Sequence, residues 1–87
     1  MSKLEKLKAR LLSRPKDFTF DEMATLLKRL GYVLDNRGKT SGSAVEFINS
    51  VTGHSIDFHK PHPSSILKEY VIRNVITKLE EGGFINE

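Results

Sequence analysis

The spacing of apolar residues changes along the chain from a helical period to an extended one. Leu4, Leu7 and Leu11 recur every three or four residues among lysines and arginines. This pattern predicts an amphipathic helix near the N-terminus. Pro15 should end that helix, because proline cannot donate the next helical hydrogen bond.

A second helix is predicted over residues 21–30 by stronger signals. Thr19 and Glu22 have the spacing of a capping box, in which each side chain accepts a hydrogen bond from the backbone N–H of the other residue. Gly31 follows the last apolar residue and is expected to end the helix in a left-handed conformation.

The period then falls to two, which predicts three short strands. They are expected over residues 32–34, 43–49 and 55–60, with a polar loop at 35–42 and a tight turn at 50–53. Such short connections favour an antiparallel meander. The alternation directs one set of side chains toward the helices: Val45, Phe47, Ile56 and Phe58. It directs a second set to the opposite face: Ala44, Glu46, Ile48, Asp57 and His59.

A last helix is predicted to run to about Glu81. Ser64 or Ser65 is expected to cap its start, and the glycines at 82–83 are expected to end it. The apolar residues at 84–85 should fold back onto the core. The inner face of this helix is expected to consist of Leu67, Tyr70, Val71, Val75 and Leu79.

The resulting order α-α-β-β-β-α predicts an α+β fold. A three-stranded antiparallel sheet should carry the two long helices on one face and leave the other face open. The length of 87 residues fits one domain, in which residues 1–15 form an N-terminal helical extension and residues 20–85 form the core.

Composition excludes several classes of protein. The chain has no cysteine, which removes disulfide scaffolds, thiolate zinc sites and cysteine nucleophiles. It has neither an apolar run long enough to cross a bilayer nor a secretion signal, so a cytoplasmic protein without membrane contact is expected. Residues 1–40 hold ten Lys/Arg against five Asp/Glu, whereas residues 41–87 hold four against six. The basic half favours binding of phosphate groups or of an acidic protein.

Three histidines, His54, His59 and His62, lie within nine residues. Their spacing matches no zinc-ligand pattern, so no metal is expected. His59 and His62 flank Lys60, and imidazoles beside a fixed positive charge suit acid–base chemistry on a phosphate. The same Pro-His-Pro run would also serve as a plain connector between strand and helix.

The loop at residues 37–43 resembles a phosphate-binding loop in composition. It lacks the spacing and the following helix of a nucleotide P-loop, which argues against ATP. A basic, hydroxyl-rich loop can still hold an RNA backbone through side chains and main-chain amides. The candidate RNA-binding residues are Arg37, Lys39, Ser41, Ser43 and Lys60.

Three short motifs in order resemble the HicA toxins of bacterial toxin–antitoxin operons. They are LLKRLGY (26–32), GKTSGS (38–43) and HKPHP (59–63). The resemblance implies a fold like the double-stranded-RNA-binding domain and an endoribonuclease that cuts mRNA without a metal or other cofactor. It also implies inhibition of growth and neutralisation by a HicB-type antitoxin protein.

One position departs from that family. Most members place a catalytic histidine after a Gly-Ser pair at the start of the second strand, whereas Ala44 follows that pair here. A methyl group cannot transfer a proton, which leaves His59 and His62 as candidate acid or base. Either the chain is a weak or inactive relative, or a basic residue was replaced so that a lethal toxin could be expressed. A non-catalytic RNA-binding module and an antitoxin-binding module are the alternative functions.

Overall fold

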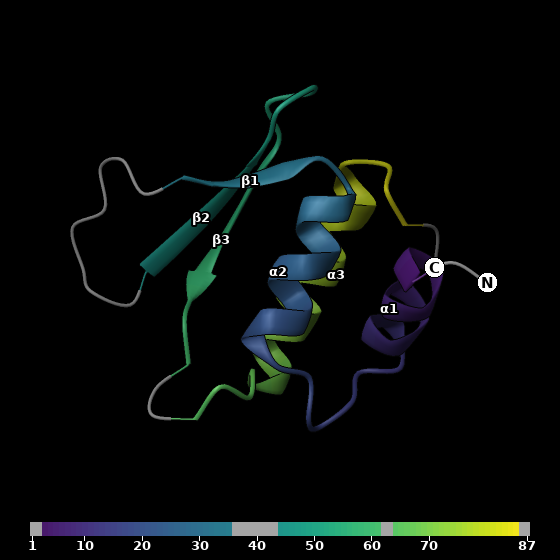
Figure 1. Ribbon diagram of the computed structural model, residues 1–87, viewed down its shortest axis with the longest axis vertical. Coiled ribbons are helices and arrows are strands. Elements are labelled where there is room, and N and C mark those ends of the chain that lie inside the picture. The colour runs from purple at the N-terminus through teal and green to yellow at the C-terminus, as the bar shows by residue number, and fades with distance from the viewer. Residues whose placement is uncertain (1–2, 36–43, 62–63, 86–87) are drawn as a thin grey trace.

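The computed structural model describes residues 3–35, 44–61 and 64–85, and it confirms the α+β class and the predicted order of elements (Figure 1). The helices are α1 (Lys3–Leu12), α2 (Phe20–Arg29) and α3 (Glu69–Glu81). The strands are β1 (Tyr32–Asp35), β2 (Ala44–Asn49) and β3 (Ser55–His59). None of the helices in these described ranges is long and apolar enough to span a bilayer.

The three strands form an antiparallel sheet in the order β1-β2-β3. The predicted alternation is confirmed in β3, where Ile56 and Phe58 are buried while Asp57 and His59 are exposed. Phe47 of β2 is fully buried opposite Ile56. One face of the sheet is therefore the wall of the core.

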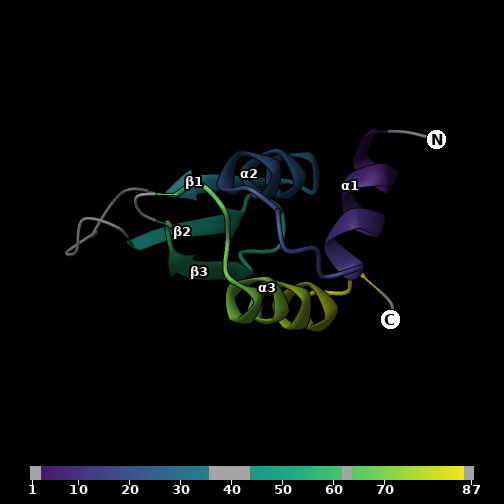
Figure 2. The same ribbon diagram turned by 90° about the horizontal axis from the view of Figure 1, so that it is seen from below.

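Helices α2 and α3 cover that inner face side by side, with α2 against β1 and α3 against β3 (Figures 1 and 2). Helix α1 packs on α2 and α3 (Figure 2). It lies at the end of these helices that is farther from the start of β2. Within the described residues, no helix lies on the outer face of the sheet, as the pattern predicted.

Aromatic contacts tie the start of α2 to the sheet. The Phe47 and Phe58 rings stack with centroids 5.9 Å apart, and Phe20 meets Phe58 edge-on at 6.1 Å. The rest of the core comes from all three helices, the connector before α2, strand β1 and the C-terminal residues. Its other large members include Leu11, Phe18, Met23, Leu26, Leu27, Tyr32, Ile72, Val75, Leu79 and Ile85.

The capping box predicted at the start of α2 is present. The Glu22 N–H donates to the Thr19 hydroxyl at 3.1 Å, and the Thr19 N–H donates to the Glu22 carboxylate at 3.0 Å. Arg10 of α1 donates to the same carboxylate at 2.9 Å, which ties α1 to this cap. Gly31 has φ +99°, the left-handed conformation expected after the helix.

The predicted start of the last helix is wrong, because α3 begins at Glu69 and no serine caps it. The preceding segment is extended and pairs with the chain before α2. The Phe20 N–H donates to the Ser65 carbonyl at 2.8 Å, and the Leu67 N–H donates to the Phe18 carbonyl at 2.8 Å. In a helix that began at the serines, the Ser65 carbonyl would accept an intrahelical hydrogen bond, but here it accepts from Phe20, and α3 begins about one turn later.

The predicted inner face of α3 is also wrong at one position, since the Tyr70 side chain is 62% exposed. The residues of α3 that face the core are Val71, Ile72, Val75, Ile76 and Leu79. Phe84 and Ile85 do fold back onto the core as predicted, with Ile85 buried.

Candidate functional site

Ala44 and His59 are paired residues on adjacent strands. Ala44 is the first residue of β2 and His59 is the last residue of β3, and the antiparallel register places them opposite each other. Both side chains point to the outer face, where paired Cβ atoms typically lie about 4.5–5.5 Å apart. A side chain longer than methyl at position 44 would therefore reach the imidazole of His59.

The outer face behind this pair is acidic. Glu46 is paired with Asp35 on one side and with Asp57 on the other, which forms a row of three carboxylates across the sheet. Such a row repels phosphate. An anion is therefore expected to approach this pair past the end of the sheet and not across its outer face.

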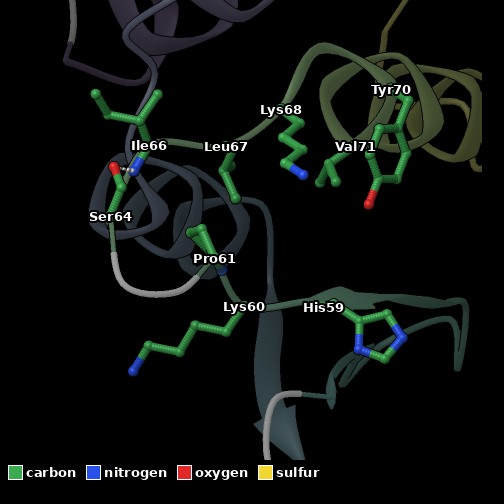
Figure 3. A pocket seen from close by; sticks show the side chains of 9 residues that line it. All are labelled: His59, Lys60, Pro61, Ser64, Ile66, Leu67, Lys68, Tyr70 and Val71. Atoms are coloured by element: carbon green, nitrogen blue, oxygen red, sulfur yellow. Dashed lines mark hydrogen bonds between the residues drawn. The ribbon is translucent and has the colours of Figure 1, made fainter.

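A hollow of about 310 Å³ lies in that direction, between the end of β3 and the start of α3 (Figure 3). His59 and Lys60 line it from the strand side, and Lys68 and Tyr70 line it from the helix side. Its remaining lining residues are Pro61, Ser64, Ile66, Leu67 and Val71. The hollow is thus lined by Lys68 and the exposed ring of Tyr70, with His59 at its rim and the Lys60 side chain directed out of it.

The segment at residues 64–68 forms one wall of the hollow and is held in place by several hydrogen bonds. Besides its backbone pairing with residues 18–20, it contains a turn in which the Ile66 N–H donates to the Ser64 hydroxyl at 3.0 Å. Buried Leu67 anchors the segment in the core. The backbone that leads into Lys68 is therefore anchored to the core.

Lys60 leaves the strand on the outside of the hollow (Figure 3), with its ammonium 5.1 Å from the centre of the Phe20 ring. This cation–π contact holds the charge near the site without neutralising it. A second hollow, of about 580 Å³, lies on the other side of the 64–68 segment. Three basic residues, Arg14, Lys16 and Lys68, and one acidic residue, Glu69, line it, so the lining carries an excess of positive charge.

The other candidate residues named from the sequence lie outside the described residues. They are Arg37, Lys39, Ser41, Ser43 and His62. The end of β1 and the start of β2 flank the segment that holds four of them, so its two anchor points lie at the same end of the sheet as His59.

His54 is far from His59 and has a different environment. His54 directly precedes the five-residue strand β3 and His59 is its last residue, so about 16 Å of extended chain separates them. His54 Nδ1 is hydrogen-bonded to the Tyr32 hydroxyl at 2.8 Å, and burial raises the pKa of the Tyr32 phenol above its ordinary value. A zinc site that uses both histidines is incompatible with this geometry, and the described residues contain no group of three or more side chains suited to a metal.

The comparison with protein families bears on these residues directly. The sequence model of the HicA toxin of bacterial toxin–antitoxin systems matches residues 20–84. The chain belongs to the HicA toxin family. Parallel searches of curated proteins and of solved structures found no match.

Members of the HicA family are ribonucleases, and a HicA toxin has a cognate antitoxin. The matched region contains α2, the whole sheet and α3, and therefore the Ala44–His59 pair and the hollow. Helix α1 precedes the matched region.

Two residues of the hollow were missed from the sequence, Lys68 and Tyr70. Tyr70 was assigned to the core, although the positions at 71, 72, 75, 76 and 79 already form a complete apolar stripe without it. That stripe was the signal that could have identified Tyr70 as an exposed residue.

Proposed function

We propose that this HicA toxin is a metal-independent endoribonuclease that cleaves mRNA in the cytoplasm and thereby inhibits translation and growth. We further propose that Ala44 occupies the position of the family's basic catalytic residue, and that a HicB-type antitoxin neutralises the protein. The observation that carries the proposal is the pairing of Ala44 with His59 at the rim of a basic hollow.

The chemistry requires two proton transfers at one phosphate. The RNA 2′-oxygen attacks the adjacent phosphorus, the bond from phosphorus to the 5′-oxygen breaks, and a 2′,3′-cyclic phosphate and a 5′-hydroxyl form. A base takes the 2′-hydroxyl proton and an acid protonates the leaving oxygen, while cations stabilise the charge on the phosphoryl oxygens.

The paired positions on β2 and β3 suit these two roles. A basic side chain at position 44 and the imidazole of His59 would flank one phosphate from adjacent strands. Lys60 and Lys68, from the two walls of the hollow, supply positive charge beside it. Arg37, Lys39, Ser41 and Ser43 complete the proposed RNA-binding set, and His62 is the other candidate acid or base.

With Ala44 in place, one member of the acid–base pair is missing. This favours a second candidate function, a chain that binds RNA and antitoxin but cleaves slowly or not at all. Loss of a positioned general base typically lowers the rate about 10²–10⁴-fold.

The test is incubation of a long RNA with the purified chain and its Ala44→His variant in EDTA. We expect Ala44→His to yield fragments with 2′,3′-cyclic phosphate and 5′-hydroxyl ends, and a 2′-deoxynucleotide at the cleaved position to block the cut. The double variant Ala44→His, His59→Ala is the matched control and should be inactive. RNA that is bound and stays intact with every variant would support the non-catalytic function instead.

A further inference from the structure

Tyr70 is a large aromatic residue whose side chain is not buried in the core. It follows the first residue of α3, its side chain is 62% exposed, and the apolar stripe of the helix begins one residue later at Val71. The ring nonetheless lines the hollow that reaches His59. The packing of the protein therefore does not account for an aromatic ring at this position.

The surroundings of the ring combine apolar walls with positive charge. Figure 3 shows the Tyr70 hydroxyl directed toward the strand that carries His59, and Lys68, which directly precedes α3, lines the same side of the hollow. Val71 lies beside the ring in Figure 3, and Leu67 adds a second apolar side chain to the lining of the hollow. A flat, partly apolar ligand with an attached anion fits such a surface better than a bare phosphate.

We infer that this hollow holds one unpaired RNA base, stacked on Tyr70, beside the phosphate that lies at Ala44 and His59. The inference rests on the proposed ribonuclease function and specifies its substrate as single-stranded RNA. Lys68 then contacts the phosphate of the stacked nucleotide, because it lines the same wall. Stacking of a base on an aromatic ring tolerates any sequence, since every base has a π-face.

The hollow suits an unpaired base better than a paired one. A volume of about 310 Å³ is at the small end of the range of ligand pockets, about 300–1,000 Å³. A paired base is stacked inside its own helix and presents only its edge, whereas a base in a single strand can turn out and stack on a side chain. Tyr70 would therefore contribute nothing to the affinity for duplex RNA.

The test is equilibrium binding of a short fluorescent single-stranded RNA to the full chain, which keeps Ala44 and so slows cleavage during the measurement. Tyr70→Ala should weaken binding roughly 5- to 100-fold, and Tyr70→Phe should bind within about twofold of the unchanged chain, because the ring does the stacking. The matched control is Val51→Ala, which removes a side chain that is 87% exposed in the hairpin turn at the other end of β3. A second RNA of the same length lacks the base that would stack on Tyr70. This abasic RNA should bind the unchanged chain and Tyr70→Ala with equal affinity.

The outcomes separate the two proposals. Single-stranded RNA that binds equally to the unchanged chain and to Tyr70→Ala would overturn the base-stacking role and leave the ribonuclease proposal standing. A chain that binds no RNA in any form would overturn both. Weaker binding of the antitoxin to Tyr70→Ala, with RNA affinity unchanged, would identify the hollow as a protein contact and also overturn the inference. Equal dependence on Tyr70 for duplex RNA would contradict the preference for single strands.

Discussion

Ala44 and His59 lie opposite each other on adjacent strands, on the sheet face that the helices leave open. The pairing brings together two positions that are fifteen residues apart in the sequence. Because paired side chains on one face are neighbours, a histidine at position 44 would lie next to His59. Under the proposed mechanism, His59 would then be one of two proton-transfer groups.

Phe47→Ala should destabilise the fold strongly. The ring is fully buried and stacks on Phe58, and loss of a buried phenylalanine typically costs about 3–5 kcal/mol. Urea unfolding monitored by circular dichroism measures this change, with exposed Val51→Ala as the control that should stay within about 0.5 kcal/mol. A loss under about 1 kcal/mol at Phe47 would contradict the inward register of β2.

Lys60→Ala and Lys68→Ala should each weaken RNA binding by a similar factor for all sequences, because a lysine reads phosphate and carries no sequence information. Each should also reduce the slope of log affinity against log salt by about 0.7–0.9. The same result is expected for Lys39→Ala. Lys28→Ala, which removes an exposed lysine near the far end of α2, is the matched control. An unchanged slope for all three site variants would remove the phosphate role of this surface.

Glu22 should make the stability of the protein depend on acidity. The hydrogen bond from Arg10 holds the pKa of the Glu22 carboxyl below its ordinary value of 4.5, with burial opposing the shift and the Thr19 N–H supporting it. A carboxyl with a lowered pKa in the folded state stabilises the protein above the unfolded pKa, and this contribution is lost as the pH falls through the folded pKa. Thermal unfolding between pH 6 and 3, at roughly half-unit steps, should therefore show a smaller acid-induced fall in Tm for Glu22→Gln than for the unchanged chain.

Glutamine retains the capping geometry at position 22 and removes only the charge, so the variant isolates the ion pair from the cap. Glu80→Gln, at an exposed position of α3, serves as the control and should keep the full acid dependence. Identical pH profiles for Glu22→Gln and the unchanged chain would show that the Arg10 contact does not shift the titration of Glu22.

Elements fixed by local chemistry were predictable from the sequence. The cap at Thr19 and Glu22, the stop at Gly31 and the alternation of β3 each depend on residues within a few positions of one another. The interactions that form each of these features involve only nearby residues, so the local sequence is enough to predict them.

The start of α3 and the hollow were not predictable in the same way. Residues 65–67 stay extended because they pair with the chain before α2, about 47 positions earlier, and no local signal in the serines reveals this. The outward direction of Ala44 and His59 followed from alternation, but their pairing depends on the register of the β2–β3 hairpin. The positions of Tyr70 and Lys68 near His59 depend both on the extended segment before α3 and on the register of the β2–β3 hairpin.

The central claim, that Ala44 stands in the catalytic position of a HicA ribonuclease, is tested most directly by the rate of RNA cleavage in EDTA. The chain as it stands is compared with Ala44→His and with Ala44→Gln, which adds comparable bulk without a base, and with His62→Ala as a further control. We predict cleavage by Ala44→His about 10²–10⁴-fold faster than by the other variants, together with growth arrest on expression in that variant alone. Equal rates and equal toxicity for Ala44→His and the unchanged chain would contradict the assignment of position 44 to the catalytic site.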